Sequence, residues 1–156
     1  VRAALKRSLA FDPGVYPPAF PYVEHRIKNE DDEWKRKAYY LVAGLWAMHW
    51  RDRGGGIVQS LANACRMLYW ANDQSSSIER RFIALIDADS EQLPHRLRQM
   101  VALLKEYEID FNKLSSDLLS WNHSDKFIQI RWAREFYNQS AEKSEEIEIT
   151  KKENVQ

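Results

Sequence analysis

Residues 34–50 read WKRKAYYLVAGLWAMHW, and this stretch decides the fold. Its apolar residues recur at intervals of three and four, the spacing of neighbours on one side of an α-helix. They divide into two stripes, Ala38, Leu41, Leu45 and Met48 on one and Tyr39, Val42, Trp46 and Trp50 on the other. Two stripes leave little of the circumference polar, so the stretch predicts a central helix that is buried on most sides.

Helical spacing also governs the chain on both sides of this helix. Residues 1–9 are expected to be the end of a helix that stops at the turn Asp12-Pro13-Gly14, and the acidic run 29–33 suits the positive end of the central helix. Further helices are predicted over residues 57–70, from Ser76, from Ser90, from Asp110 and over about 125–139. No segment alternates in the manner of a strand, so the predicted fold class is all-α.

The breaks between these helices predict two small packed bundles, over residues 1–73 and 74–141, followed by a charged tail, 142–156, that is expected to be disordered. In the first bundle, the helix 57–70 is expected to bury Ile57 and to expose Arg66. In the second, Ser76 and Glu79 have the spacing of a capping box, and Ser90 is predicted to cap the next helix. Pro94 fits there only in the first turn.

Composition limits the class of protein. The chain has 156 residues, 44% of them hydrophobic, with no apolar run long enough for a membrane span and no stretch that resembles the apolar region of a secretory signal. Its single cysteine, Cys65, cannot form an intramolecular disulfide, which indicates the cytoplasm. The chain begins with Val1 rather than methionine, which leaves open whether an N-terminal piece is missing.

Residue patterns of catalysis and metal binding are absent from the sequence. The four histidines share no ligand spacing with one another or with Cys65, which is expected to be inert in the middle of a helix. The run Gly54 to Gly56 lacks the Gly-Lys-Ser/Thr ending of a phosphate-binding loop. We therefore expect a protein that is not an enzyme and that needs no cofactor, metal or small-molecule substrate.

Charge is unevenly distributed along this neutral chain. Residues 35–105 contain eleven Lys and Arg against six Asp and Glu, an excess of five. Candidate phosphate contacts are two arginines on the glycine loop and four at outer or flanking helix positions, namely Arg51, Arg53, Arg66, Arg80, Arg81 and Arg98. The alternative is that these arginines only pair with surface acids such as Glu79, Asp87, Asp89 and Glu91, and the charges alone favour neither reading.

Aromatic residues offer a second possible contact with nucleic acid, because bases stack on their rings. Most of them recur at helical spacing, which is typical of a core. Trp70 and Tyr137, near predicted helix ends, are the two that stay open as stacking residues.

Several segments in succession resemble the CasB family, the small subunit of the type I-E CRISPR complex Cascade. They are Pro18-Ala19-Phe20, Gly55-Gly56-Ile57 through Leu61-Ala62, Ile78-Glu79-Arg80-Arg81-Phe82 through Asp87-Ala88-Asp89, the arginine- and leucine-rich stretch Leu93 to Leu104, and Asp110 to Trp121. The similarity runs from about Ala3 to Tyr137. Arg80 and Arg81 match the paired arginines of the family motif, and Arg96 and Arg98 match its arginine-rich helix.

This resemblance implies a helical, non-catalytic subunit of an antiviral ribonucleoprotein. In that family, two copies stack head to tail beside the other Cascade subunits, support the hybrid of guide RNA and target DNA, and hold the displaced DNA strand, which stabilises the R-loop. The alternative from a different class is a helical protein–protein adaptor without direct nucleic-acid contact. A helical RNA-processing enzyme is disfavoured, because no acid–base or metal constellation can be assembled from the sequence.

Overall fold

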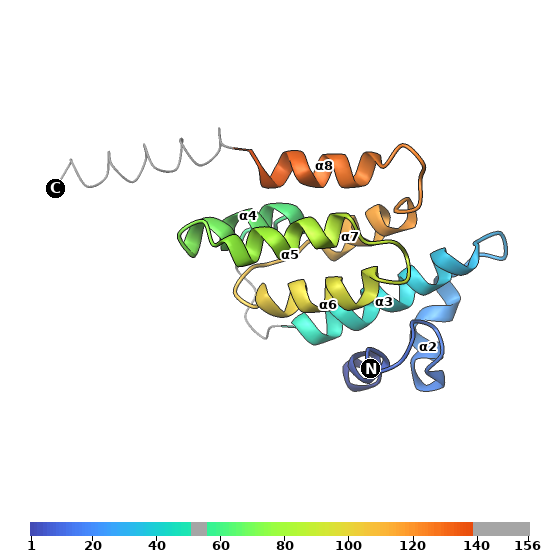
Figure 1. The fold of residues 1–156 in the computed structure, drawn as a ribbon. Helices are drawn as coiled ribbons and strands as arrows, with labels where there is room; N and C mark the ends of the chain where they lie inside the picture. Colours follow the sequence, from blue (N-terminus) through green and yellow to red (C-terminus); the bar gives the residue numbers. More distant parts are fainter. Residues whose placement is uncertain (51–55, 139–156) are drawn as a thin grey trace.

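Helices account for all the regular structure in the computed structural model, which describes residues 1–50 and 56–138 (Figure 1). The elements are α1 Arg2–Ser8, η1 Pro17–Ala19, α2 Phe20–Val23, η2 Glu24–Arg26, α3 Glu33–His49, α4 Leu61–Ala71, α5 Ser76–Ile86, α6 Leu93–Leu103, α7 Phe111–Leu119 and α8 Phe127–Phe136, where η marks a 3₁₀ helix. Within these two ranges the only strand-like pairing is one parallel bridge between Gln59 and Ile109. The predicted all-α class is confirmed.

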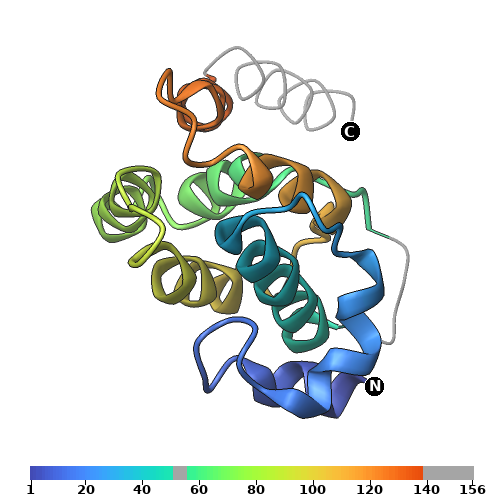
Figure 2. The same cartoon turned by 90° about the vertical axis from the view of Figure 1, so that its right-hand side faces the viewer.

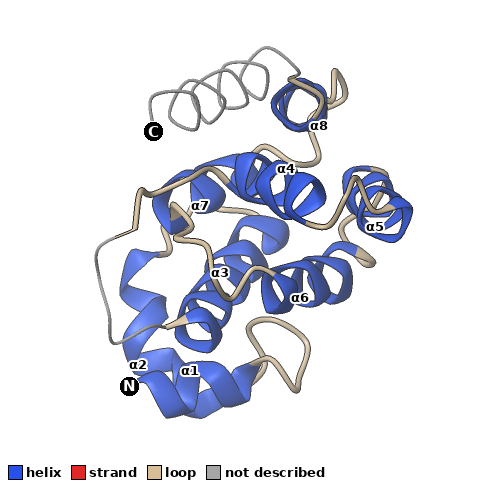
Figure 3. Cartoon of the chain, turned by 90° about the vertical axis from the view of Figure 1, so that its left-hand side faces the viewer, coloured by secondary structure: helices blue, strands red, loops and turns tan. Residues whose placement is uncertain are grey.

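Helix α3 lies at the centre, as its two apolar stripes predict, with α1, α6 and α7 packed around it (Figure 3). Leu41 and Leu45 are at most 2% exposed. The helix begins where the acidic run ends, because the Asp32 carboxylate accepts a hydrogen bond from the backbone N–H of Lys35 at 2.8 Å. The N-terminal segment lies on one side of α3 and α8 lies at the opposite end of the molecule (Figures 1 and 2).

The core consists of one large and one small cluster of buried side chains. The large one combines residues of α3 and α4 with residues of α5 to α8, so it includes Leu41 and Ala64 as well as Phe82 and Leu97. The small one joins α1, η1 and α2 to the other side of α3. Because the large cluster extends to both sides of residue 73, the core is continuous there, and the division into bundles at that residue remains a prediction.

Helix α4 begins four residues later than its apolar pattern predicts. The backbone of Gln59 bonds to the chain before α7, with its N–H on the Glu108 carbonyl and its carbonyl on the Asp110 N–H, both at 2.8 Å. The Ser60 hydroxyl then caps the helix by accepting from the Asn63 N–H. Ile57 therefore precedes the helix and is 82% exposed, so its predicted burial is wrong.

Two of the predicted helix caps are also wrong. The N-cap of α5 is Ser75, which makes no side-chain cap, so the capping box from Ser76 to Glu79 does not form. Before α6 the cap-like acceptor is Asp89 rather than Ser90, since its Oδ1 accepts from the N–H groups of Glu91 and Gln92. A carboxylate accepts such bonds more strongly than a hydroxyl does. Pro94 lies in the first turn of α6, as predicted.

A buried polar network fastens α8 to α7. The Asp117 side chain is 8% exposed and accepts hydrogen bonds from the Trp132 indole N–H at 2.9 Å and from the Arg131 guanidinium. The Trp121 indole N–H donates to the carbonyl of Ala88 at 2.9 Å and thereby ties the turn after α7 to the end of α5. These bonds satisfy polar groups that would otherwise lose their water without compensation.

The predicted tail 142–156 lies outside the described residues. Over the helices that the structure does describe, none is both long and apolar enough to cross a membrane.

Candidate nucleic-acid interface

The seven arginines predicted to contact nucleic acid lie in different environments. Arg51 and Arg53 are outside the described residues. Arg66 is only 8% exposed, because α5 and α8 pack against α4. Its predicted place on an outer face is therefore wrong, and a contact between this side chain and a phosphate stays a prediction.

Arg80 and Arg81 are exposed on α5, as predicted. Arg80 donates from Nε to the carbonyl of Ser76 at 3.4 Å. Their neighbour Glu79 is engaged elsewhere, since it accepts from the Tyr137 hydroxyl at 3.0 Å and lies 3.5 Å from the Tyr69 hydroxyl. Burial and the hydrogen bond to Glu79 raise the pKa of Tyr137 to about 12. Tyr137, which the sequence left open as a stacking residue, thus binds α8 to α5.

Arg96 is half-buried between α5 and α6. Its Nη1 donates to the carbonyl of Ala84, in the last turn of α5, where the Ala88 N–H bonds to Leu85 instead. An arginine that supplies a hydrogen bond to a carbonyl at a helix end stabilises that end. The structure thus gives Arg96 a role in fastening α6 to α5.

Replacing Arg96 with methionine is expected to lower the free energy of unfolding by about 1.5 kcal/mol, because the Ala84 carbonyl loses a charged donor. Denaturant unfolding of the variant measures this loss. Arg81→Met is the matched control, since the exposed Arg81 has no polar partner among the described residues, and its effect is expected to stay within about 0.5 kcal/mol. If Arg96→Met and Arg81→Met lost equal free energy of unfolding, the role of Arg96 in fastening α6 to α5 would be contradicted.

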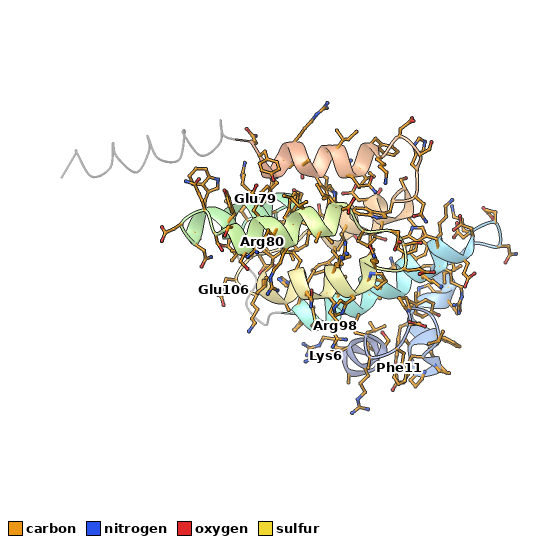
Figure 4. The ribbon with its side chains drawn as sticks, in the orientation of Figure 1. Lys6, Phe11, Glu79, Arg80, Arg98 and Glu106 are labelled. Carbon is orange, nitrogen blue, oxygen red and sulfur yellow. The ribbon has the colours of Figure 1, made fainter. Side chains whose placement is uncertain are left out.

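Arg98 connects α6 to the end of α1. It is exposed, and its Nη1 donates to the carbonyl of Leu9, the residue that follows α1, at 2.7 Å. Lys6 and Arg7, in the last turn of α1, are exposed as well. Lys6 and Arg98 project on the α1 side of the molecule, whereas Arg80 lies on α5 (Figure 4). We call Lys6, Arg7 and Arg98 the α1–α6 basic patch.

The α1 half of this patch was not predicted, because the charge excess found in the sequence covers only residues 35–105. The available signal was composition: helices α1 and α6 together contain five Lys and Arg and no Asp or Glu. Where these two segments meet, at the bond from Arg98 to Leu9, the helices themselves contribute only positive charge.

Ion pairs do not neutralise these exposed cations within the described ranges. In the described part of the chain, the carboxylates that form ion pairs do so with other cations, for example Glu24 with Arg36 and Glu135 with Lys113. The described part of the chain shows no ion pair of Lys6, Arg7, Arg80, Arg81 or Arg98. The alternative, that the three exposed arginines pair with Glu79, Asp87, Asp89 and Glu91, is therefore not found there.

The side chains that could act as nucleophiles or metal ligands form no site in the described part of the chain. Cys65 is fully buried on α4, and burial raises the pKa of its thiol, which leaves it protonated and inert. His49 is also buried, with Nε2 2.9 Å from the carbonyl of Leu104. Among the side chains in the described part of the chain, no three potential metal ligands gather at one place.

Comparison with known proteins identifies the fold and the family. A profile of the family described as CRISPR-associated protein Cse2 matches residues 1–137. The CRISPR-associated protein Cse2 of Thermus thermophilus is 46% identical over 154 residues, which cover 94% of this chain and 86% of the relative. The crystal structure of CasB from Thermus thermophilus, also 46% identical, superposes with a TM-score of 0.77 over 88% of this chain and 84% of that one.

A chain of a CRISPR RNA-guided surveillance complex has the same fold, with a TM-score of 0.78 over 94% of this chain and 86% of that chain, at 19% identity. The profile match covers most of the sequence, and the relative from Thermus thermophilus is similar along nearly the whole chain. The predicted resemblance is thereby confirmed, and the chain belongs to the Cse2 family of CRISPR-associated proteins, which includes the proteins named CasB.

Proposed function

We propose that this chain is the non-catalytic small subunit of a type I-E CRISPR Cascade ribonucleoprotein. In that complex it supports the hybrid of guide RNA and target DNA and binds the displaced DNA strand, which stabilises the R-loop in antiviral defence. Its partners are the other Cascade subunits and a second copy of itself, stacked head to tail. The observation that carries the proposal is the set of exposed cations on α1, α5 and α6 that form no ion pair within the described residues.

Contacts with phosphates explain how a neutral chain can hold DNA of any sequence. A guanidinium carries five N–H donors, so Arg98 can keep its bond to Leu9 and still offer donors to a phosphate. Such contacts release counterions and carry no sequence information. In such complexes base pairing with the guide reads the sequence, so the subunit only has to recognise the backbone.

Avidity removes the conflict between zero net charge and nucleic-acid binding. A few cations on one subunit bind weakly alone, but a subunit anchored in the complex meets the strand at a high effective concentration. Arg51 and Arg53, which lie outside the described residues, are proposed as further contacts.

The test compares target-DNA binding by the reconstituted complex with this subunit present, absent, or carrying Arg80→Glu and Arg81→Glu. We expect a shorter R-loop lifetime both without the subunit and with the variant, and a binding constant that falls with salt, with a slope of about −0.7 per neutralised phosphate for a single strand. If absence shortens the lifetime but the variant does not, the subunit is a scaffold, as the adaptor hypothesis holds. If neither does, the proposed function is wrong.

A further inference from the structure

A pocket of about 270 Å³ lies beside the α1–α6 basic patch. It is formed between the loop that follows α1 and the first turns of α6, and its walls include Phe11 and Asp12 from the loop and His95 and Arg98 from α6. Tyr40 of α3, which is 2% exposed, also lines it. We call it the Phe11 pocket, and Phe11, Lys6 and Arg98 project on this side of the molecule (Figure 4).

Phe11 is an exposed aromatic platform at the edge of this pocket. The ring is 52% exposed, and it stacks on the ring of Tyr16 at a centroid distance of 5.0 Å and an interplanar angle of 9°. The loop between the two rings is anchored to α3, since the carbonyl of Gly14 accepts a hydrogen bond from Arg36 at 2.9 Å. A ring that stacks on a neighbour with one face can stack a second planar group on its opposite face.

The polar walls of the pocket suit a base better than a phosphate. Asp12 and Glu91 bring two carboxylates, and His95 and Arg98 bring donors. The carboxylates repel a phosphate, whereas the edge of a base presents donors and acceptors side by side. The backbone of Glu91 is held at the start of α6, because its N–H donates to the Asp89 carboxylate at 3.0 Å, and its exposed side chain lines the pocket.

We propose that the Phe11 pocket takes one unstacked base of the displaced strand and prefers cytosine to thymine. The base stacks on Phe11 while its phosphates lie on the α1–α6 basic patch, so the inference rests on the proposed function and deepens it. Cytosine carries an exocyclic amino group that can donate to Glu91 or Asp12, whereas thymine has a carbonyl at that position, which the carboxylates repel.

The experiment uses the reconstituted complex and a target duplex opened in advance by mismatches. The target strand stays constant, and the unpaired strand carries either deoxycytidines or deoxythymidines along the opened region, so that only the displaced bases differ. We expect the deoxycytidine substrate to bind about fivefold more tightly. Glu91→Gln is expected to reduce this preference, because an amide can also donate to thymine.

Stacking is tested on the same substrates with Phe11→Leu. Loss of the aromatic ring is expected to weaken binding of both substrates about tenfold. Phe11→Trp should keep the affinity, which separates loss of stacking from a disturbed loop. Phe127→Leu on α8 is the matched control, because Phe127 is similarly exposed, at 44%, but lies on another helix, and it should change nothing.

Equal affinity for the two substrates, together with no effect of Phe11→Leu, would overturn the pocket proposal. If salt-dependent binding that needs this subunit persisted in that case, the proposed function would still hold. If DNA binding did not need the subunit at all, both the pocket proposal and the proposed function would be overturned. If Phe11→Leu instead releases the subunit from the complex without changing DNA affinity, the pocket holds a segment of a neighbouring protein and the proposal is wrong.

Discussion

We expect Asp117→Ala to lower the free energy of unfolding by about 3 kcal/mol relative to the unsubstituted chain. Removal of the carboxylate leaves the Trp132 indole N–H without an acceptor, and Trp132 is only 1% exposed, so water cannot replace the bond. The guanidinium of Arg131 loses its bond to Asp117 as well, although its side chain is 38% exposed and can turn to solvent, which limits that part of the cost. For a chain of this length, such a loss lowers the midpoint of thermal unfolding by about 10 °C.

Thermal and denaturant unfolding of three variants tests this expectation. Asp117→Asn keeps an oxygen acceptor for the indole but loses the charge, so it should fall between Asp117→Ala and the unsubstituted chain. Asp125→Ala removes an acid whose side chain is 82% exposed and should have little effect. An Asp117→Ala midpoint that matches that of Asp125→Ala would show that the α7–α8 network contributes nothing to stability.

The double variant Lys6→Glu with Arg98→Glu is expected to weaken binding of target DNA by the reconstituted complex about 100-fold at low ionic strength. Each substitution removes an attraction to a phosphate, worth about 1 kcal/mol between unit charges at about 4 Å in water, and adds a weaker repulsion, because the shorter Glu side chain keeps its charge farther from the phosphate. Salt screens these exposed charges, so the difference from the unsubstituted complex should shrink as salt is added.

The control for this experiment must change the net charge by the same amount elsewhere. Lys28→Glu with Arg134→Glu does so at two exposed cations, one before α3 and one on α8, away from α1 and α6. Circular dichroism establishes that both proteins are folded. If the two double variants lose equal affinity, the effect comes from overall charge and the α1–α6 basic patch has no special role.

The sequence predicted the helices that bury a regular stripe and begin at a carboxylate. Helix α3 lies where its two stripes place it, and α7 starts at Asp110, whose carboxylate accepts from the Lys113 N–H as the pattern implies. Ile128, Trp132 and Phe136 on α8 are all buried, as expected. Such features depend on residues within a few turns of each other, so periodicity and capping chemistry suffice to find them.

The errors in predicted burial and exposure lie where distant segments decide the environment. Ile57 has helical spacing with Leu61, but pairing of Gln59 with the chain before α7 keeps residues 57–60 out of the helix. Arg66 would face outward on an isolated α4, but α5 and α8 pack against that helix. Lys6 joins Arg98 because α1 ends beside α6, a contact that no local pattern predicts. Positions on a helix can be read from sequence, but the neighbours that cover them cannot.

The bond between Arg98 and the Leu9 carbonyl also has a consequence for the order of synthesis. Its two residues are 89 positions apart, so α1 leaves the ribosome long before α6 exists. At 5 to 20 residues per second, α1 waits roughly 5 to 20 s for this partner, although it can pack against α3 much earlier. The α1–α6 basic patch is thus completed late in translation, and a nascent chain does not present a finished surface to nucleic acid before most of its core has been made.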